Sequence, residues 1–177
     1  MKTIKKSAIT AIFSVAVLCL AACTFGGDDD TDYDKSLLAA GSTAPVFTMT
    51  TDEYPDGISL AALRGGYVLI EFWRSGCKDC QAATGRMKEL HAAYAPLGVT
   101  FVGVSFDTDV DAWRTYIENN GLDWMQHCER KSGSESTVGA AYNIKWVPTF
   151  YLIDPEGKID FATVYIEKMA ERLESIK

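Results

Sequence analysis

The sequence predicts an α/β fold with a mixed central β-sheet, and three observations predict it. Residues 67–73 form a nearly continuous apolar run, which is typical of a strand buried on both faces of a sheet. Strand-like and helix-like segments then alternate, as they do when helices join parallel strands. Near the C-terminus, a turn at residues 154–157 separates two strand-like runs, which should therefore pair antiparallel. Such a sheet needs helices on both faces, which makes a three-layer sandwich.

An N-terminal β-hairpin is expected before the central strand. Residues 46–51 alternate weakly between apolar and polar positions, and residues 58–60 are another short strand-like segment. Between them lies the turn signal Pro-Asp-Gly at residues 55–57. We expect this hairpin to be an extension of the sheet domain.

A helix is expected directly after the central strand. Ala83, Met87, Leu90 and Tyr94 are spaced by four, three and four residues, so they form one apolar stripe. The Pro-x-Gly at residues 96–98 ends this helix.

The second half of the chain continues the alternation. A strand is expected over residues 99–106. Thr108 and Asp111 resemble a capping box at the start of a helix that reaches Gly121. The remaining expected elements are strands over residues 147–153 and 159–164 and a closing helix over residues 166–176.

The N-terminus differs in kind from the rest of the chain. Three lysines among the first six residues precede the uncharged run 8–20, and the small residues Leu-Ala-Ala-Cys follow at 20–23. The apolar run is too short to cross a bilayer comfortably. Residues 1–22 are therefore expected to be a secretory signal peptide.

The end of this segment resembles the lipobox of bacterial lipoproteins, in which the cysteine after the cut carries lipid. The alternative is an ordinary cleavage site that happens to precede a cysteine. We expect Cys23 to be lipidated and to anchor the protein to a membrane. Residues 23–40, rich in Gly and Asp, should form an acidic flexible tether, and residues 41–177 the folded domain.

The acidic run after Cys23 also bears on location. In some Gram-negative lipoproteins such a run resembles a surface-export signal; the alternative is a solvated linker. We expect a cell-envelope protein that faces the periplasm or the cell surface, with the outer membrane as the expected site.

Charge limits the partners. Without residues 1–22, which contain three lysines and no acid, the chain carries 14 basic and 24 acidic residues, a net charge of −10. Such a balance argues against nucleic acid and anionic lipid surfaces as partners.

Five cysteines occur in the chain. Cys19 would leave with the signal peptide and Cys23 would be the lipid site. Cys77, Cys80 and Cys128 remain, in a compartment that permits disulfides. Because three is an odd number, one pair and one free thiol is the simplest arrangement.

Cys77 and Cys80 lie where the buried strand ends and a helix begins. A helix N-terminus presents unpaired N–H groups and partial positive charge, which stabilise a thiolate. Cys77, at the exposed end, is the candidate nucleophile. Cys80, three residues on, can resolve a mixed disulfide by forming the Cys77–Cys80 disulfide. Lys78 should favour the Cys77 thiolate and Asp79 should oppose it.

Two other roles for this pair stay open. Half of a zinc site is one, but only His127 and Cys128 could complete it. A purely structural disulfide is the other, although it would not need a strand-to-helix junction. We expect no metal and no cofactor.

Glu71 interrupts the apolar strand six residues before Cys77. Burial would raise the pKa of this carboxyl, so Glu71 could accept and return the proton of Cys80. The alternative is an edge strand with Glu71 in water. Pro148 opens a later strand, a position that proline tolerates, and its bond to Val147 could be cis or trans.

Together these features resemble the TlpA/ResA-like branch of the thioredoxin-like proteins. The resemblance implies a thioredoxin-like sandwich, a cis Val147–Pro148 bond packed against the cysteines, and a substrate site at Trp73, Gly76, Val147 and Pro148. It also implies reduction of protein disulfides outside the cytoplasm, fed by a membrane electron-donor protein. The segments that carry it are residues 41–47, 72–80, 102–107 and 147–157.

The chain departs from that branch at the site itself. Gly76 stands where a Trp is common, and no Pro precedes Cys80. Glu71 takes a place often held by Asn in this branch and by Asp in thioredoxin. Residues 81–85 replace the Glu-x-Pro that often follows the second cysteine. These departures leave the exchange chemistry in place and do not specify a substrate.

Two rival functions follow from the same features. A peroxiredoxin-like peroxidase shares the fold, but its reactive cysteine follows Thr or Ser by three residues, where Arg74 stands here. The other rival is a surface lipoprotein that only binds a partner and uses the cysteine pair as a staple.

Three further residues have a structural interpretation and a functional alternative. Cys128 is expected to be a small buried thiol, with a third redox cysteine as the alternative. His91 and His127 show no partner at triad spacing and are expected to be structural or solvent-facing.

Overall fold

The apolar run at residues 67–73 forms the central strand of the domain. The computed structural model describes residues 32–177, and in it β3 (Val68–Trp73) is buried along its whole length. It pairs in parallel with β4 (Thr100–Ser105) and antiparallel with β6 (Thr149–Ile153). A strand with neighbours on both sides and cover on both faces needs apolar side chains in both directions.

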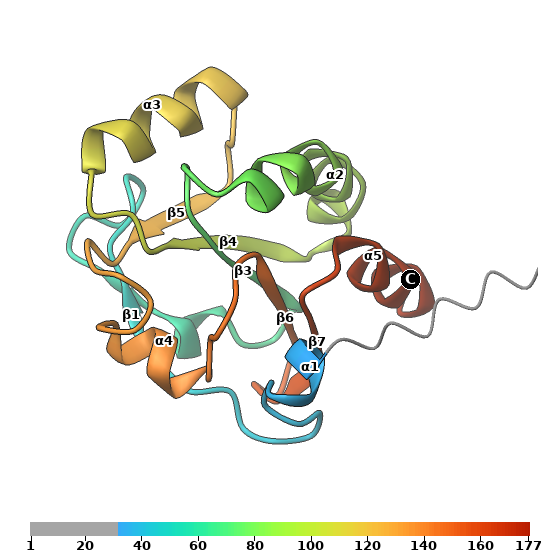
Figure 1. Cartoon of the computed structure of the whole chain (residues 1–177). Helices are drawn as coiled ribbons and strands as arrows, with labels where there is room; N and C mark the ends of the chain where they lie inside the picture. Colours follow the sequence, from blue (N-terminus) through green and yellow to red (C-terminus); the bar gives the residue numbers. More distant parts are fainter. Residues whose placement is uncertain (1–31) are drawn as a thin grey trace, which may run out of the picture.

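Two outer strands complete a mixed sheet in the order β5-β4-β3-β6-β7. β5 (Met125–Cys128) joins β4 in parallel, and β7 (Ile159–Thr163) joins β6 antiparallel. The parallel half is connected by helical crossovers, whereas the antiparallel half needs only the turn between β6 and β7. Figure 1 shows this sheet through the middle of the domain. The predicted mixed sheet is confirmed.

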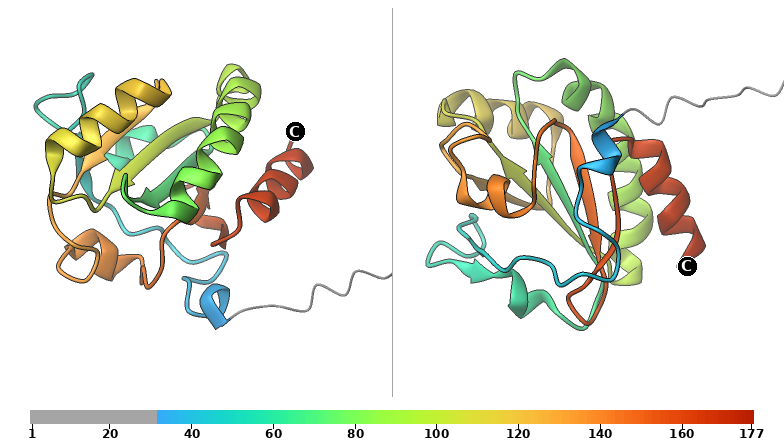
Figure 2. Two further views of the ribbon diagram at one scale, coloured as in Figure 1. Left: turned by 45° about the horizontal axis from the view of Figure 1, so that its top comes forward. Right: turned by 60° about the horizontal axis from the view of Figure 1, so that its bottom comes forward.

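Helices lie on both faces of the sheet (Figures 1 and 2). One core lies between the sheet and the long helices α2, α3 and α5, and a second core lies beneath the opposite face. The first face carries α2 (Lys78–Tyr94), which continues into η2 (Ala95–Leu97), α3 (Val110–Asn120) and α5 (Ile166–Ser175). The second face carries η1 (Leu60–Leu63), α4 (Thr137–Ala141) and the hairpin β1 (Thr48–Met49) and β2 (Ile58–Ser59). The predicted sandwich and N-terminal hairpin are confirmed, with a thinner second layer.

The apolar stripe of α2 is buried as predicted, and Gly98 and Gly121 end their elements with φ of 92° and 59°. These left-handed values suit glycine, which has no Cβ to clash. The predicted capping box at Thr108 is wrong. Asp109 caps α3 instead, and its carboxylate accepts hydrogen bonds from the backbone N–H groups of Asp111 and the residue that follows it.

The segment expected to be a tether, residues 23–40, is described from residue 32 onward. There it forms α1 (Asp32–Lys35), which lies beside the sheet edge at β7. The Asp34 carboxylate accepts hydrogen bonds from the Thr163 hydroxyl at 3.1 Å and the Val164 N–H at 2.9 Å. Residues 32–40 therefore pack on the domain, which differs from the expected boundary at Gly41.

Candidate active site

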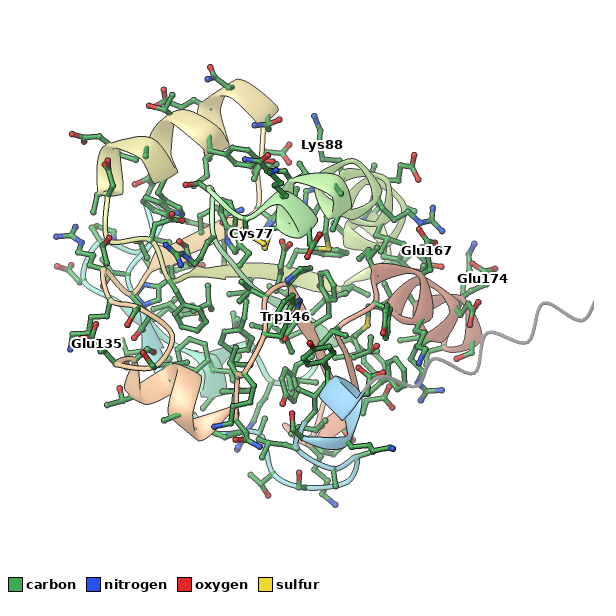
Figure 3. The ribbon with its side chains drawn as sticks, in the orientation of Figure 1. Cys77, Lys88, Glu135, Trp146, Glu167 and Glu174 are labelled. Carbon is green, nitrogen blue, oxygen red and sulfur yellow. The ribbon has the colours of Figure 1, made fainter. Side chains whose placement is uncertain are left out.

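Cys77 is held at the junction between β3 and α2. It is the N-cap residue of α2, and its Sγ accepts the backbone N–H of Cys80 at 3.3 Å. The side chain is partly exposed. Figure 3 shows Cys77 near the start of α2, with Trp146 between it and α1. This position places the sulfur at the positive end of the helix dipole, where negative charge is favoured.

Cys80 occupies the opposite environment. It is 2% exposed and packs in the core between α2 and the sheet. Burial, above all, raises its pKa far above the usual range, and the Cys77 sulfur and Glu71 raise it further. Both cysteines are free thiols in this structure. The pair therefore contains one reachable sulfur and one protonated sulfur that needs a base before it can react.

Glu71 lies in the middle of the central strand. Its register partners are Gly103 on β4 and Phe150 on β6, and its side chain is 5% exposed. Burial raises the pKa of its carboxyl to about 8. The edge-strand alternative is wrong, because Glu71 has a strand on each side. A carboxyl close enough to Cys80 to raise its pKa, and itself poised near neutral pH, suits proton exchange with that thiol.

The Val147–Pro148 peptide bond is cis, as the resemblance implied. The carbonyl of Val147 faces Cys77 and accepts its Sγ–H at 3.5 Å. β6 begins one residue after Pro148, and Thr149 pairs with Phe72 on β3. The sheet register therefore brings the proline segment beside the cysteines.

Two grooves flank this site. One encloses about 750 Å³ and is lined by Cys77, Gly76, Val147 and residues on the loop before α4. The other encloses about 420 Å³ and passes Pro148 and the start of α5. Trp146 belongs to both grooves and is 45% exposed. Single exposed aromatics are ordinary, but this one separates two grooves beside a reachable thiol.

Trp73 lies elsewhere than predicted, and Tyr33 lies at the site although no role was predicted for it. Trp73 was expected to contact substrate, but it is 2% exposed and packs against Tyr116 with ring centroids 5.6 Å apart. Its place is the core beneath the site. Tyr33, which drew no attention in the sequence, lies against Trp146 with centroids 5.0 Å apart and lines the second groove.

A buried carboxylate fixes the loop that carries Cys77. Asp107, just beyond β4, accepts the Ser75 backbone N–H at 2.9 Å and the Ser75 hydroxyl at 2.8 Å. The Ser105 hydroxyl donates a third hydrogen bond at 2.6 Å. No role was predicted for these residues. Their only signal was that Ser105 and Asp107 belong to a segment that carries the family resemblance.

Cys128 is partly exposed rather than fully buried, and its Sγ donates to the carbonyl of Asp107 at 3.3 Å. Burial raises its pKa above the usual value. It is a free thiol in this structure.

Both histidines have carboxylate partners that the sequence did not reveal. His127 Nε2 lies 3.0 Å from Glu129, and His91 Nδ1 lies 3.3 Å from Asp123. His91 also packs on the ring of Trp124. Both histidines therefore have structural contacts outside the cysteine site.

Residues 32–177 contain no helix that could span a membrane and no metal-binding cluster. None of the helices there is both long and apolar enough to span a bilayer. Within the same range, His, Cys, Asp and Glu side chains form no group of three or more that could hold a metal ion.

Known proteins are similar to this chain in sequence. A sequence profile of the AhpC/TSA family matches residues 40–162. The thiol-disulfide oxidoreductase ResA of Geobacillus kaustophilus is 30% identical, over 94% of this chain and 95% of that protein. ResA of Geobacillus thermodenitrificans is 31% identical over 81% of this chain and 82% of its own length.

Solved structures agree with these sequence matches. The thioredoxin domain of a thiol-disulfide oxidoreductase from Bacteroides vulgatus has a TM-score of 0.70 and 31% identity, covering 78% of this chain and 98% of that one. A thiol-disulfide oxidoreductase from Bacteroides fragilis has a TM-score of 0.70 and 29% identity, covering 77% of this chain and 100% of that one.

Proposed function

Because the chain belongs to the AhpC/TSA family and is related within it to ResA thiol-disulfide oxidoreductases, we propose that it reduces protein disulfides outside the cytoplasm. It is a thioredoxin-like thiol-disulfide oxidoreductase that works through Cys77 and Cys80. One observation carries the proposal. A partly exposed cysteine caps a helix, and a fully buried cysteine lies one turn away beside a buried carboxyl.

The first step uses Cys77. Its thiolate attacks one sulfur of a substrate disulfide, the substrate S–S bond breaks, and a Cys77–substrate bond forms. The released substrate thiolate takes a proton from solvent. The helix N-terminus and the Cys80 N–H stabilise the attacking sulfur. The Val147 carbonyl and Gly76 border the groove in which the substrate would lie.

The second step uses Cys80 and Glu71. Glu71 takes the proton of Cys80, and the Cys80 thiolate attacks Cys77 Sγ. The Cys77–substrate bond breaks, the second substrate thiolate leaves, and the Cys77–Cys80 disulfide forms. Two electrons have then passed from the dithiol to the substrate. Burial of Cys80 makes this base necessary, because the thiol stays protonated at neutral pH without it.

The reduced state would be restored by a membrane electron-donor protein, which passes two electrons and returns the protons. We also propose that Cys23 is lipidated after removal of residues 1–22, so that the domain is anchored in the cell envelope. The lipobox-like sequence before Cys23 supports the anchor, and the resemblance to the TlpA/ResA-like branch supports the donor. Labelling cells with a radioactive fatty acid tests the anchor, and Cys23→Ala should lose the label.

Insulin reduction tests the catalytic proposal directly. Reduced protein should precipitate insulin chains in the presence of a dithiol reductant, and Cys77→Ser should abolish this activity. Cys128→Ser is the matched control, because it also replaces a partly exposed thiol but lies away from α2. Insulin reduction that survives Cys77→Ser would instead favour a binding module with a structural cysteine pair.

A further inference from the structure

Glu71 belongs to a row of residues that crosses the sheet beneath α2 and α3. It pairs with Gly103 on β4, and Gly103 pairs with Gln126 on β5. Paired residues of neighbouring strands place their side chains on the same face. The row therefore runs from Glu71 across a position without a side chain to Gln126.

Gln126 fills the place above that glycine. A Cβ added to Gly103 would lie 2.2 Å from Gln126 Oε1 and 3.0 Å from Trp73 Nε1. The amide of Gln126 therefore reaches over β4 toward β3, where Glu71 is the next residue in the row. Adjacent strands are about 4.8 Å apart, so the amide lies over the strand next to Glu71, with room for a bridging water between the two groups.

The polar groups around this position lack protein partners. Gln126 is 9% exposed, and both atoms of its amide are unbonded within the described part of the chain. The same holds, within residues 32–177, for the indole N–H groups of Trp73 and Trp113. Each buried polar group left unbonded costs about 1–3 kcal/mol, so such groups normally hold water.

Water can approach this cluster from outside the sheet. Gln126 and Trp113 line two cavities of about 290 and 370 Å³, which also share Thr51 and Arg114. These cavities lie between α3, β5 and the loop that follows β1. The Gln126 side chain thus has one side toward the Glu71 row and the other toward space large enough for water.

We propose that Gln126 positions water that carries protons between Glu71 and the cavities beside α3. The inference rests on the proposed function, in which Glu71 takes one proton from Cys80 when the mixed disulfide is resolved. That proton leaves Glu71 for a water held by the Gln126 amide and the Trp73 indole, and it passes to solvent at the cavities. During re-reduction of the Cys77–Cys80 disulfide, one proton returns along the same route to Cys80.

Within residues 32–177, few titratable groups lie near Glu71. The titratable groups that face it from α2 are Cys80 and, next to Cys80, Cys77. The elements on its other sides present neutral groups: Gly103 and Phe150 from the neighbouring strands, and Tyr116, through its contact with Trp73, from α3. A change in the titration of Glu71 after substitution of Gln126 would therefore report on the amide and its water.

The test follows the two steps separately. All proteins compared, including the wild-type reference, carry Cys128→Ser, so that this partly exposed thiol does not react. Each is reduced and mixed with the disulfide dithiobis-nitrobenzoate, which releases a coloured thiolate. Attack by Cys77 releases one coloured thiolate in a fast phase, and resolution by Cys80 releases the second. Gln126→Leu should leave the first phase unchanged and slow the second at least about tenfold, a loss that removal of proton relay can cause. The pH midpoint of the second-phase rate should move upward, because Glu71 loses polar groups nearby.

Two further variants support the interpretation. Met125→Leu is the control, since Met125 is the adjacent residue on β5 and packs against the opposite core; both phases should match wild type. Gly103→Ala should reproduce the Gln126→Leu effect by displacing the amide, and it serves if Gln126→Leu does not fold.

The outcomes separate the two proposals. A wild-type protein that releases only one coloured thiolate, or that does not reduce insulin, would overturn the proposed function. Two normal phases in wild type, with an unchanged second phase and pH midpoint in folded Gln126→Leu or Gly103→Ala, would overturn the proton route alone.

Discussion

The carboxylate of Asp107 holds Ser75 through both its backbone N–H and its hydroxyl, at 2.9 and 2.8 Å. Ser75 lies two residues before Cys77, in the loop between β3 and α2. Gln81 adds a hydrogen bond to the Ser75 carbonyl at 2.7 Å. The position of the reactive sulfur therefore depends on a buried contact between two strand ends.

Loss of that contact should loosen the loop. Asp107→Ala removes the acceptor of three hydrogen bonds and should lower the free energy of unfolding by about 2–3 kcal/mol, since hydrogen bonds to charged groups are strong. The fast phase of the dithiobis-nitrobenzoate reaction should also slow. Chemical denaturation and stopped-flow absorbance measure the two effects. Asp111→Ala, in the first turn of α3, is the control; equal effects in both variants would contradict the prediction.

Cys80→Ser should trap the substrate. Without the resolving thiol, the bond between Cys77 and its partner persists, because the competing attack on Cys77 Sγ is lost. Mass spectrometry of adducts purified from cells under non-reducing conditions identifies the partner. The double variant Cys77→Ser/Cys80→Ser controls for other thiols. Adducts in equal amount with that double variant would place the reactive thiol elsewhere.

Glu71 should make stability fall as pH rises. Burial raises the pKa of its carboxyl from 4.5 to about 8, so between these values the folded protein binds a proton that the unfolded chain has lost. The free energy of unfolding should decrease by up to about 1.4 kcal/mol per pH unit within this window. Glu71→Gln should remove this dependence and be more stable than wild type above pH 8.

The same variant separates stability from activity. Glu71→Gln lacks the proton acceptor, so resolution by Cys80 should slow while attack by Cys77 is retained. Denaturation curves at several pH values and the two-phase thiolate release provide the measurements. A Glu71→Gln protein with a wild-type second phase would show that another group takes the proton.

Trp146 should matter for protein substrates and not for small ones. It is 45% exposed and lines both grooves, and large aromatic side chains dominate protein interfaces. Trp146→Ala should raise the KM for a protein disulfide about tenfold, which corresponds to a modest hot spot. The rate with dithiobis-nitrobenzoate should stay close to wild type. Leu97→Ala, another exposed apolar residue, is the control.

Much of the fold could be predicted because its signals are local. The central strand and α2 are long and regularly patterned, so their periods are visible in a short window. β5 and α4 were missed because they span four and five residues, and β5 carries the polar Gln126 and His127. Elements this short take their structure from the sheet edge and the core that they meet rather than from their own pattern.

The candidate site divides in the same way. Cys77 and Cys80 are close in sequence, and their junction between strand and helix is a local feature. Asp107 and Ser75 are 32 positions apart, so nothing in one sequence joins them. Trp73 was assigned to the substrate site because the family resemblance implied it, but its side chain packs in the core beside Tyr116. Only the three-dimensional register could decide that.

The docking of α1 limits the length of chain between Cys23 and the folded domain. Asp34 fastens the chain to Thr163 and Val164, beside the Trp146 groove, and nine residue steps separate Cys23 from Asp32. With Cys23 acylated as proposed, full extension of those steps spans only about 30 Å. The active site would then stay within a short distance of the lipid headgroups. Partners embedded in that membrane would come within its range, whereas proteins free in the bulk would have to diffuse to the membrane first.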